Sequence, residues 1–407
     1  MAHQPELKTA YNDAREAMMS TYAPPETVFV RGEGAYVYTA EGDKYLDFFA
    51  GIAVNCLGHC HPDLVKVLQQ QAGDLWHLSN AFRVPAGEAL AKRLAELANL
   101  DKVFFTNSGT ESVECGLKMM HRYHFDQGNP DRYRIIGTRS AFHGRSFAAI
   151  CAAGNPTHTK GFTREDEGYD HVPFNDLAAV EAIIGDNTAG VIVEPVQGEG
   201  GINVAEPGYL EGLRALCDKH GALLMFDEVQ CGISRTGKVF GYQNADVQPD
   251  IIALAKGLGG GFPVGACVAS EKVAKGMVVG THGSTYGGNF LAMAVATKVI
   301  DIVTQPEFLQ QVQESAKTLH AKLQGLVDKY PAILSEVRGS GLMIGLRCHD
   351  ADANGKLLML AREEQMLMTK AGDNIVRLLP PLIIDDSHIN EAVEKLDRAL
   401  TAYSTGS

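Results

Sequence analysis

Long apolar runs are missing from this 407-residue chain, and none approaches the roughly 20 residues of a membrane helix. The N-terminus, MAHQPELKTAYNDAREAMM, is polar and has no apolar segment of the kind that marks a secretory signal. Basic residues are also scarce, since 36 Lys and Arg stand against 49 Asp and Glu, for a formal net charge of −13. Neither a nucleic acid nor an anionic membrane is therefore expected as the main partner. We expect a soluble, cytoplasmic protein.

The cysteines form no recognisable pattern. Eight are scattered along the chain, and no two have the CxxC spacing of redox or zinc motifs. One stretch brings Cys56, His59, Cys60 and His61 together, but its spacing matches no standard zinc pattern. We expect a turn there before a helix that begins at Pro62, and no metal site. Reduced and mostly buried thiols are typical of a cytosolic protein.

Two short apolar runs, Ala222–Phe226 and Ile251–Ala255, stand out in a chain of ordinary globular composition, with 45% hydrophobic and 21% charged residues. Neither run alternates, and both are bounded by turn signals, which is typical of strands buried on both faces of a parallel sheet. The first run ends at Asp227 and the second at Lys256. Because ligands bind beyond the carboxyl ends of strands in open α/β sheets, we expect this acid and this lysine to share one crevice.

An aspartate and a lysine in one crevice suit the chemistry of an aldehyde cofactor. A lysine forms a Schiff base with an aldehyde. Pyridoxal phosphate is an aldehyde, and a nearby carboxylate keeps its ring nitrogen protonated so that the ring accepts electrons. A structural Asp–Lys ion pair is the alternative, and two residues alone do not decide between them. The glycines after Lys256 are not a dinucleotide motif, because a strand from Gly265 to Ser270 is expected after them instead of a helix.

The sequence around Asp227 and Lys256 indicates a specific protein family. The stretches FDEVQCGISRTG and QPDIIALAKGLGGGFPVGA closely resemble the class III aminotransferases, a pyridoxal-phosphate family of fold type I. The resemblance extends from about Phe29 to Pro381. It implies that Lys256 binds pyridoxal 5′-phosphate covalently as a Schiff base and that Asp227 faces the ring nitrogen. It also implies that Val229 packs on the ring and that Gln230 meets its phenolic oxygen.

A second motif, Ser108-Gly109-Thr110, follows an expected strand at Lys102–Asn107 and precedes a helix expected from about Glu111 to Phe125. Free amides and the helix dipole make such a helix start a phosphate site. A plain N-cap, in which Ser or Thr satisfies the first turn, is the alternative. The resemblance places the cofactor phosphate at this motif, on Ser108, Gly109 and Thr110.

Other roles come from the resemblance alone. Phe142, in the motif AFHGRS, is expected to stack on the cofactor ring. Glu199 is expected to act as a switch opposite Arg377, which clamps an α-carboxylate, although a solvated loop acid and a structural ion pair are the alternatives. Arginine suits carboxylates because its planar fork donates two parallel hydrogen bonds. The expected substrate-binding residues are Tyr22, Arg145, Glu199, Ser284 and Arg377.

The loop THGSTYGGN, residues 281–289, is expected to cross to a partner subunit. In the resembled family its threonine, here Thr285, binds the phosphate of the other subunit. The resemblance therefore implies a homodimer with active sites at the interface.

The order of elements and the resemblance predict an α/β fold of type I. We expect a mostly parallel central sheet with helices on both faces, and a smaller α+β lobe formed by the N- and C-terminal segments. The expected boundaries are an N-terminal segment at 1–60, a large cofactor-binding domain at 61–305 and a small domain at 306–407. The expected elements include a helix within 1–28, an antiparallel meander at Val28–Asp47, a loop at Ala50–His61, a strand at Val337–Leu346 and a helix at Leu357–Met366.

Within the family, Leu46–His61 and the stretch HGSTYGGN most resemble the members that act on N2-acetylornithine. Gly51 stands about where ornithine aminotransferases carry a tyrosine, and a glycine leaves room for an acyl group. We expect ping-pong transfer of the ω-amino group of N2-acetylornithine to 2-oxoglutarate, giving N-acetylglutamate semialdehyde and glutamate in arginine biosynthesis, with succinylated donors as side substrates. The open alternatives are an ornithine, succinylornithine or 4-aminobutyrate aminotransferase, a mutase of the same fold, an inactive cofactor-binding protein and an NAD enzyme.

Overall fold

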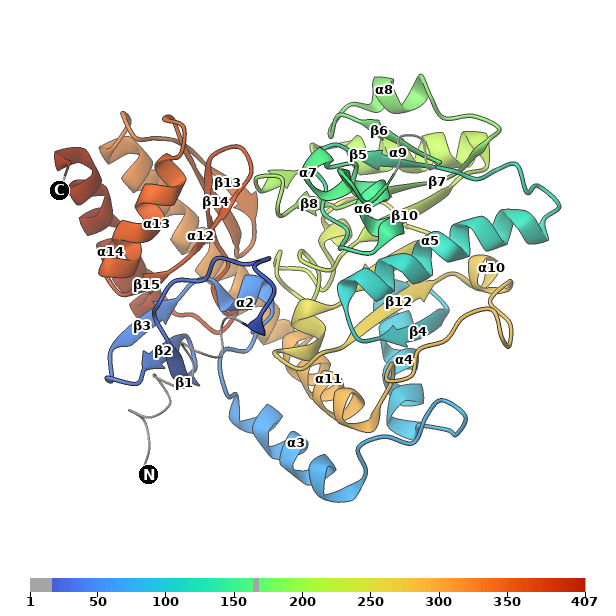
Figure 1. The fold of residues 1–407 in the computed structure, drawn as a ribbon, viewed down its shortest axis with the longest axis horizontal. Helices are drawn as coiled ribbons and strands as arrows, with labels where there is room; N and C mark the ends of the chain where they lie inside the picture. Colours follow the sequence, from blue (N-terminus) through green and yellow to red (C-terminus); the bar gives the residue numbers. More distant parts are fainter. Residues whose placement is uncertain (1–16, 164–167, 407) are drawn as a thin grey trace.

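The apolar runs around Asp227 and Lys256 form neighbouring strands of a seven-stranded sheet (Figure 1). The computed structural model describes residues 17–163 and 168–406, and there β10 (Leu223–Asp227) pairs in parallel with β11 (Ile251–Leu254). The strand order is β4-β12-β11-β10-β7-β5-β6, and β12 alone runs antiparallel to its neighbours. The predicted mostly parallel sheet is confirmed. Its other strands are β4 (Lys102–Thr106), β5 (Arg134–Thr138), β6 (Tyr169–Val172), β7 (Thr188–Val193) and β12 (Gly265–Ala269).

The central strands are buried on both faces because successive side chains of a strand point to opposite sides. Leu224 and Phe226 join the apolar core that contains α4 (Pro85–Ala98) and α9 (Tyr209–His220). Leu223 and Met225 join the core that contains α5 (Gly109–Asp126) and α6 (Phe147–Ala153). Burial on both faces therefore explains why the sequence of β10 is apolar without alternation.

The smaller lobe combines an N-terminal and a C-terminal segment, β1–β3 and residues 306–406, which lie side by side on the left of Figure 1. Its N-terminal meander has turns at Gly34 and Gly42, and Met366 of the C-terminal segment pairs in parallel with Leu46. A second sheet has the order β13-β14-β17-β16. The predicted α+β lobe of both terminal segments is thus confirmed. Its strands are β1 (Phe29–Glu33), β2 (Tyr36–Thr39), β3 (Lys44–Asp47), β13 (Leu334–Ser340), β14 (Met343–Cys348), β15 (Met366–Leu367), β16 (Thr369–Ala371) and β17 (Ile375–Leu378).

Two predicted elements of this lobe had the wrong bounds. The single strand expected at Val337–Leu346 is a hairpin of β13 and β14 that turns at Gly341. Gly341 has a φ of +59°, and a Cβ there would lie 2.5 Å from the Arg235 carbonyl oxygen, so the turn needs glycine. The helix expected at Leu357–Met366 is α13 (Ala353–Glu363), which ends before β15. The domain boundaries near residues 60 and 305 stay predictions.

The region expected as a loop at Ala50–His61 begins with a left-handed turn, labelled α2 (Ala50–Ala53). All four of its residues have φ between 47° and 64°. The buried Asp47 carboxylate accepts hydrogen bonds from the amides of Phe49 (2.9 Å) and Ala50 (2.8 Å), and its other oxygen lies 2.6 Å from Nε2 of His59. These contacts stabilise a backbone conformation that costs about 1–2 kcal/mol for each non-glycine residue.

The remaining elements connect and cover the two lobes. The helix expected within residues 1–28 lies mostly outside the described residues. Among the described helices, none is both long and apolar enough to cross a membrane. The elements not yet named are α3 (Pro62–Asp74), α7 (Pro156–Thr159), α8 (Leu177–Glu181), α10 (Glu271–Ala274), α11 (Phe290–Val303), α12 (Pro306–Lys329), α14 (Asp386–Thr405), β8 (Val196–Gln197), β9 (Asn203–Val204) and the 3₁₀ turns Gly241–Asn244 and Lys256–Gly259.

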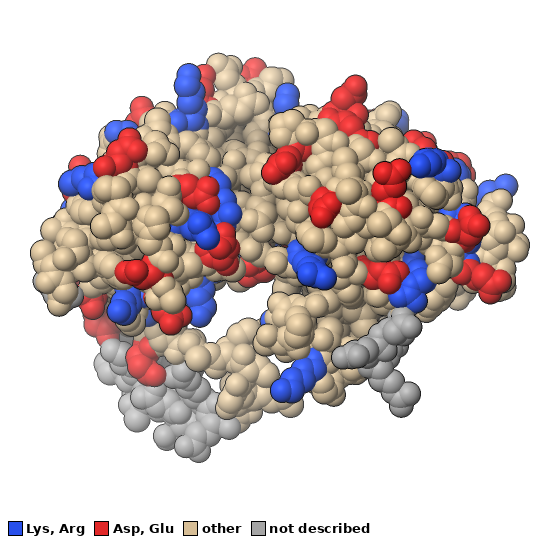
Figure 2. Space-filling view, turned by 90° about the horizontal axis from the view of Figure 1, so that it is seen from above, with Lys and Arg blue, Asp and Glu red and all other residues tan. Residues whose placement is uncertain are grey.

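Charged side chains are mixed on the surface that Figure 2 draws. Acidic and basic groups alternate over both lobes on this face, and the molecule is hollowed between the lobes. On this face neither the acidic nor the basic residues gather in one area.

Candidate active site

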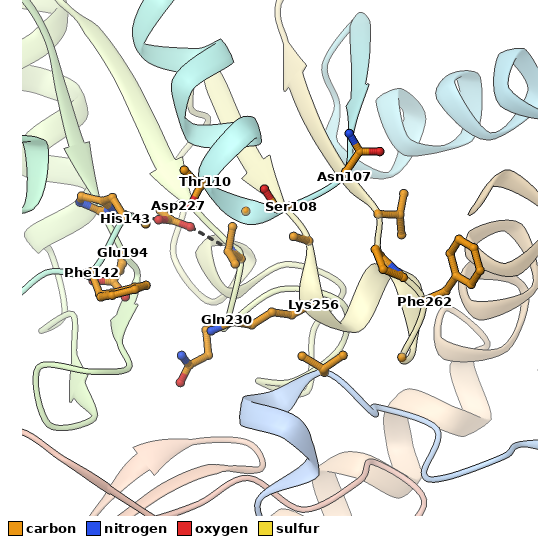
Figure 3. Close-up of a pocket in the computed structure, with 18 residues that line it drawn as sticks. Asn107, Ser108, Thr110, Phe142, His143, Glu194, Asp227, Gln230, Lys256 and Phe262 are labelled. Atoms are coloured by element: carbon orange, nitrogen blue, oxygen red, sulfur yellow. Dashed lines mark hydrogen bonds and ion pairs between the residues drawn. The ribbon is translucent and has the colours of Figure 1, made fainter. Parts of the chain in front are cut away.

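A cavity of about 350 Å³ lies beyond the carboxyl ends of β10 and β11 (Figure 3). This volume suits a small cofactor. The walls come from the ends of β4, β10 and β11, from the start of α5 and from Val54, just after α2. Thr285 does not line the cavity. Eight of the nine residues predicted to bind the cofactor do: Ser108, Gly109, Thr110, Phe142, Asp227, Val229, Gln230 and Lys256.

Lys256 extends across the middle of this cavity toward Gln230 (Figure 3). It follows β11 and has a φ of +44°, an unusual left-handed value for a side-chain-bearing residue. Burial lowers the pKa of its amine to about 8, although the negative charge of Glu199 acts in the opposite direction. An amine with such a pKa is partly unprotonated near neutral pH, so it can act as a nucleophile and as a base.

Asp227 is held at the end of β10 by two hydrogen bonds. One oxygen lies 2.8 Å from Nδ1 of His143, and the other accepts the amide of Val229 at 3.0 Å. Burial acts to lower the pKa of His143, but the hydrogen bond and charge of Asp227 outweigh it and raise that pKa. Both carboxylate oxygens are therefore engaged, which fixes the orientation of Asp227.

Glu194 follows β7 and holds the neighbouring loop. Its two oxygens accept hydrogen bonds from the amides of Phe142 (3.0 Å) and Gly198 (3.3 Å). Burial raises the pKa of Glu194 to about 7, and the charge of His143 acts to lower it. The ring of Phe142 lines the cavity, and a buried acid thus holds the backbone of this residue in place (Figure 3).

The first turn of α5 forms another wall. This helix begins at Gly109, two residues before the predicted start, so Gly109 and Thr110 belong to its first turn. Ser108 is the N-cap, as in the alternative interpretation, and its Oγ accepts the amide of Glu111 at 3.3 Å. The other first-turn amides have no acceptor within the helix and favour an anion.

Two glycines keep this end of the cavity open. A Cβ on Gly109 would lie 2.7 Å from a methyl carbon of Val229. A Cβ on Gly144, whose φ is +124°, would lie 2.2 Å from Oγ1 of Thr110. A side chain at either position would displace a residue of the cavity wall.

Glu199 and Arg377 meet beside the cavity as predicted, although 178 residues separate them in the sequence. Nη1 of Arg377 donates to Glu199 at 2.7 Å and to Oε1 of Gln230 at 3.0 Å. Arg377 is only 1% exposed. Burial acts to raise the pKa of Glu199, but the charge and hydrogen bond of Arg377 lower it overall. The pair is therefore ionised and closed in this structure.

The other predicted substrate-binding residues lie further out. The guanidinium of Arg145 lies 5.5 Å from the centre of the Phe142 ring. Ser284 accepts a hydrogen bond from the side chain of Asn107, which lines the cavity. Tyr22 is 86% exposed, and neither it nor Thr285 lines the cavity of this chain.

Sequence reasoning missed His143 and Glu194 as site residues. Glu194 ends the apolar run GVIVE, so the argument that identified Asp227 applies to it equally. His143 lies in the motif AFHGRS, directly after the expected stacking aromatic. Its contact with Asp227 spans 84 residues, and no local signal predicts that distance.

Comparison with known proteins decides the family. The profile of the family described as "Aminotransferase class-III" matches residues 18–400. The chain is a class III aminotransferase. This aminotransferase is 48% identical over 380 residues to the acetylornithine aminotransferase of Mesorhizobium japonicum, with 93% of this chain and 95% of the relative covered.

Solved structures agree on the fold. This aminotransferase superposes on the ornithine aminotransferase from Toxoplasma gondii ME49 with a TM-score of 0.93 and 30% identity, covering 100% of this chain and 97% of the other. It superposes on the N-acetylornithine aminotransferase from Stenotrophomonas maltophilia K279a with a TM-score of 0.83 and 37% identity, covering 95% and 99%. Enzymes named for two donors share the fold, so the fold alone does not select the donor.

The cofactor of this aminotransferase is pyridoxal 5′-phosphate, as its family implies. The cavity fits that group. It contains an amine of lowered pKa on Lys256, an oriented carboxylate on Asp227, the side chains of Phe142 and Val229 for a planar ring, and the amides of a helix start for a phosphate. Each part of the cofactor thus meets a residue type suited to it.

Proposed function

We propose that this aminotransferase transfers the ω-amino group of N2-acetylornithine to 2-oxoglutarate. The products are N-acetylglutamate semialdehyde and glutamate, and the reaction belongs to arginine biosynthesis. The observation that carries the proposal is the closed Glu199–Arg377 pair, which Gln230 links to the cavity, because this pair would neutralise a clamp for α-carboxylates while an ω-amine enters. The acetyl group is supported by the names of the relatives at about 48% identity over most of the chain.

Bound pyridoxal phosphate supplies an electron-accepting ring and a carbon that exchanges amino groups. Lys256 holds the cofactor and serves as the base that removes a proton from the donor carbon bearing the reacting amine. Asp227, oriented by His143, keeps a proton on the ring nitrogen. Glu194 holds the Phe142 backbone, so that Phe142 would pack on the bound ring, while Ser108, Gly109 and Thr110 would hold the phosphate. Val229 and Gln230 complete the contacts to the ring.

The two substrates use the same cavity differently. For N2-acetylornithine, whose reacting nitrogen is far from its carboxylate, Arg145 binds the α-carboxylate and Glu199 stays on Arg377. For glutamate and 2-oxoglutarate, Glu199 releases Arg377, which then binds the α-carboxylate beside the reacting carbon. Ser284 and Tyr22 complete the donor site. In this scheme one ionised pair separates ω-amine donors from α-amino acids.

A half-reaction on the purified protein tests the proposal. Adding N2-acetylornithine without an oxo acid should rapidly bleach the visible absorption band of the cofactor, and 2-oxoglutarate should restore it. Ornithine and 4-aminobutyrate, added separately, should bleach the band more slowly. If ornithine or 4-aminobutyrate bleaches the band and N2-acetylornithine does not, the proposed donor is wrong. If turnover does not require 2-oxoglutarate, a mutase is favoured.

We also propose that the enzyme is a homodimer in which Thr285 reaches the partner's phosphate. Thr285 lies outside the cavity of its own chain, on an exposed loop. The side chain of Asn80 donates to the carbonyl oxygens of Ser284 and Gly287, which ties this loop to residues 75–82. The two segments expose a group of large apolar side chains of the kind that marks an interface: Leu75, Trp76, Leu78, Phe82, Val278, Val279 and Tyr286.

Mixed dimers of two inactive variants test this arrangement. In a dimer of one Lys256→Ala chain and one Thr285→Ala chain, both substitutions fall in one of the two active sites. The second active site should therefore be intact. Mixing the two variants should therefore restore activity that neither shows alone. Without restoration, Thr285 would belong to its own chain or to no site.

We further propose that the enzyme acts in the cytoplasm. All eight cysteines are free thiols, and seven of them are buried. Free thiols persist in a reducing compartment. If cells are lysed and unfolded in the presence of an alkylating reagent, all eight cysteines of the protein should be alkylated. A disulfide in the protein would contradict the proposal.

A further inference from the structure

The turn that precedes Arg377 has an uncommon backbone. Strands β16 and β17 form a hairpin whose turn contains Gly372, Asp373 and Asn374. Asp373 and Asn374 have φ of 53° and 54°, so two consecutive non-glycine residues are left-handed. Asn and Asp tolerate this conformation better than other side chains, and two left-handed central residues define the tight hairpin turn. The amide of Ile375 closes it by donating to Gly372 at 3.3 Å.

This turn touches the Glu199 loop backbone to backbone. The amide of Gly372 donates to the carbonyl oxygen of Glu199 at 2.8 Å. A Cβ on Gly372 would lie 2.8 Å from the Gly200 oxygen, and a Cβ on Gly201 would lie 2.8 Å from the Gly372 oxygen. The contact is between backbone atoms only. A movement of the turn would therefore also move the backbone of Glu199.

The same hairpin therefore contacts both members of the closed pair. It carries Arg377 on β17, where Arg377 is the pairing partner of Thr369 on β16. It holds Glu199 through Gly372. The position of the hairpin relative to the Glu199 loop thus sets how well the 2.7 Å contact between Glu199 and Arg377 is made.

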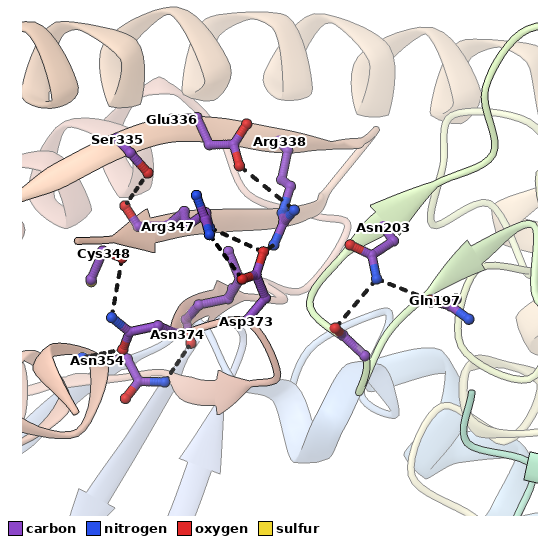
Figure 4. A network of polar contacts seen from close by, with 12 residues as sticks. Gln197, Asn203, Ser335, Glu336, Arg338, Arg347, Cys348, Asn354, Asp373 and Asn374 are labelled. Carbon is purple, nitrogen blue, oxygen red and sulfur yellow. Dashed lines mark hydrogen bonds and ion pairs between the residues drawn. The ribbon is translucent and has the colours of Figure 1, made fainter. Parts of the chain in front are cut away.

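One acid and two arginines connect the turn of this hairpin to β13 and β14, the other two strands of the same sheet (Figure 4). One oxygen of Asp373 lies 2.6 Å from Nη2 of Arg338 on β13 and 3.0 Å from Nε of Arg347 on β14. Its other oxygen accepts from Nη2 of Arg347 at 3.1 Å. Burial acts to raise the pKa of Asp373, but the hydrogen bonds of the two arginines lower it overall. Asp373 is thus ionised and bonded to both strands of the β13–β14 hairpin.

This cluster is not required to form the turn itself. The side chain of Asn374 donates to the carbonyl oxygen of Cys348 at 3.1 Å and also contacts that of Asp350, so the turn has a second, uncharged anchor. Asp373 and Arg347 are 40% and 43% exposed, and exposed ion pairs add little to stability. The cluster is better suited to fixing the direction of the turn than to stabilising the fold.

We propose that Asp373, with Arg338 and Arg347, is a positioning residue that holds the β16–β17 turn against the Glu199 loop and thereby favours the closed Glu199–Arg377 pair. The inference rests on the proposed function, in which the closed pair admits the ω-amine donor and the open pair admits glutamate. Loosening the cluster raises the population of the open pair. The apparent affinity for glutamate and 2-oxoglutarate rises with that population.

The test is Asp373→Asn in the cofactor-loaded enzyme. Asparagine keeps the left-handed preference and the size of the side chain but removes the charge. The measured quantity is kcat/KM of each half-reaction, for glutamate and for N2-acetylornithine. We expect the glutamate to N2-acetylornithine ratio to rise on the order of three- to tenfold, since couplings between neighbouring sites have this size. Glu336→Gln is the matched control, because Glu336 lies 3.6 Å from Arg338 and does not contact the turn.

A double-mutant cycle decides whether the effect passes through Glu199. Glu199→Gln alone should raise the same ratio, and adding Asp373→Asn to it should change nothing further. An unchanged ratio in Asp373→Asn, with Glu199→Gln still effective, overturns the positioning role and leaves the proposed function intact. The positioning role is also overturned if Asp373→Asn changes the ratio equally in the parent enzyme and in Glu199→Gln. No shift in Glu199→Gln overturns the proposed switch itself.

Amide hydrogen exchange gives a readout that does not depend on activity. In Asp373→Asn, peptides that contain Gly372 should exchange faster than in the parent enzyme, because the 2.8 Å bond to Glu199 is weakened. In Glu336→Gln they should exchange at the parent rate. Parent-like exchange in both variants contradicts the inference.

Discussion

The two ends of the candidate active site are built differently. At one end, Asp227 is the last residue of β10 and Lys256 follows the neighbouring strand β11; Asp227 is buried and Lys256 is half-buried. At the other end, Glu199 follows β8 near the central sheet, whereas Arg377 lies on a strand of the smaller lobe. The Glu199 side chain is 34% exposed, against 4% for Asp227. We therefore expect the bond-making end, which two neighbouring strands hold, to be rigid. The end that we propose to sort substrates is a contact between two lobes, and we expect it to be adjustable.

Removing the amine should break the rigid end completely. We expect Lys256→Ala to lower both half-reactions by a factor on the order of 10⁴ or more, because the nucleophile and the base are lost together. Single-turnover absorbance with each substrate measures this. Lys66→Ala, on an exposed face of α3, is the control and should match the parent enzyme. A variant that keeps a tenth of the activity would contradict the role of Lys256.

Neutralising the acid at the same end should have the second largest effect. We expect Asp227→Asn to slow both half-reactions about 10²- to 10⁴-fold, since an amide does not keep a proton on the ring nitrogen. The size should be similar for N2-acetylornithine and for glutamate. A loss confined to one substrate would place Asp227 at the sorting end instead.

Changing the adjustable end should alter preference more than rate. We expect Glu199→Gln to raise the glutamate to N2-acetylornithine ratio of kcat/KM about 10- to 100-fold, because Arg377 is no longer neutralised by a 2.7 Å ion pair. The two half-reactions, measured separately, provide the ratio. Equal effects on both substrates would mean that the pair is structural.

The pH dependence should report the burial of Lys256. In the cofactor-free enzyme its pKa is about 8, so the unprotonated, reactive amine increases as pH rises through that value. We expect the rate of cofactor capture to rise about tenfold per pH unit below 8 and to level off above it. Stopped-flow absorbance from pH 6 to pH 9.5 measures this. A rise that continues to pH 9.5 would indicate an ordinary, exposed lysine.

The smallest effect is expected at the donor entrance. We expect Gly51→Tyr to lower kcat/KM for N2-acetylornithine about fivefold more than for ornithine, because the ring fills space for an acyl group. Gly51→Ala is the matched control for the left-handed backbone, where a Cβ meets nothing closer than 3.6 Å. Equal losses for the two donors would refute the argument from space. Gly51 does not itself line the cavity of one chain, whereas Val54 does.

Much of the rigid end was predictable because its signals are local. An apolar run that ends in a charge predicted the positions of Asp227 and Lys256, and a hydroxyl-rich turn predicted the start of α5 to within two residues. The contact of His143 with Asp227 was not predictable, because it depends on how two distant loops meet. The β13–β14 hairpin was missed because the turn signal, Gly339-Ser340-Gly341, lies inside the segment that was assigned to one strand.

The sequence by itself determined which side chains end the strands, where α5 begins to within two residues and which family the motifs resemble. These follow from periodicity and from short-range backbone geometry. Only the tertiary structure decided that Glu199 and Arg377 lie 2.7 Å apart, that His143 orients Asp227 and that Asp373 joins two arginines. Such contacts depend on the packing of two lobes around common cores, and packing is a property of the whole chain.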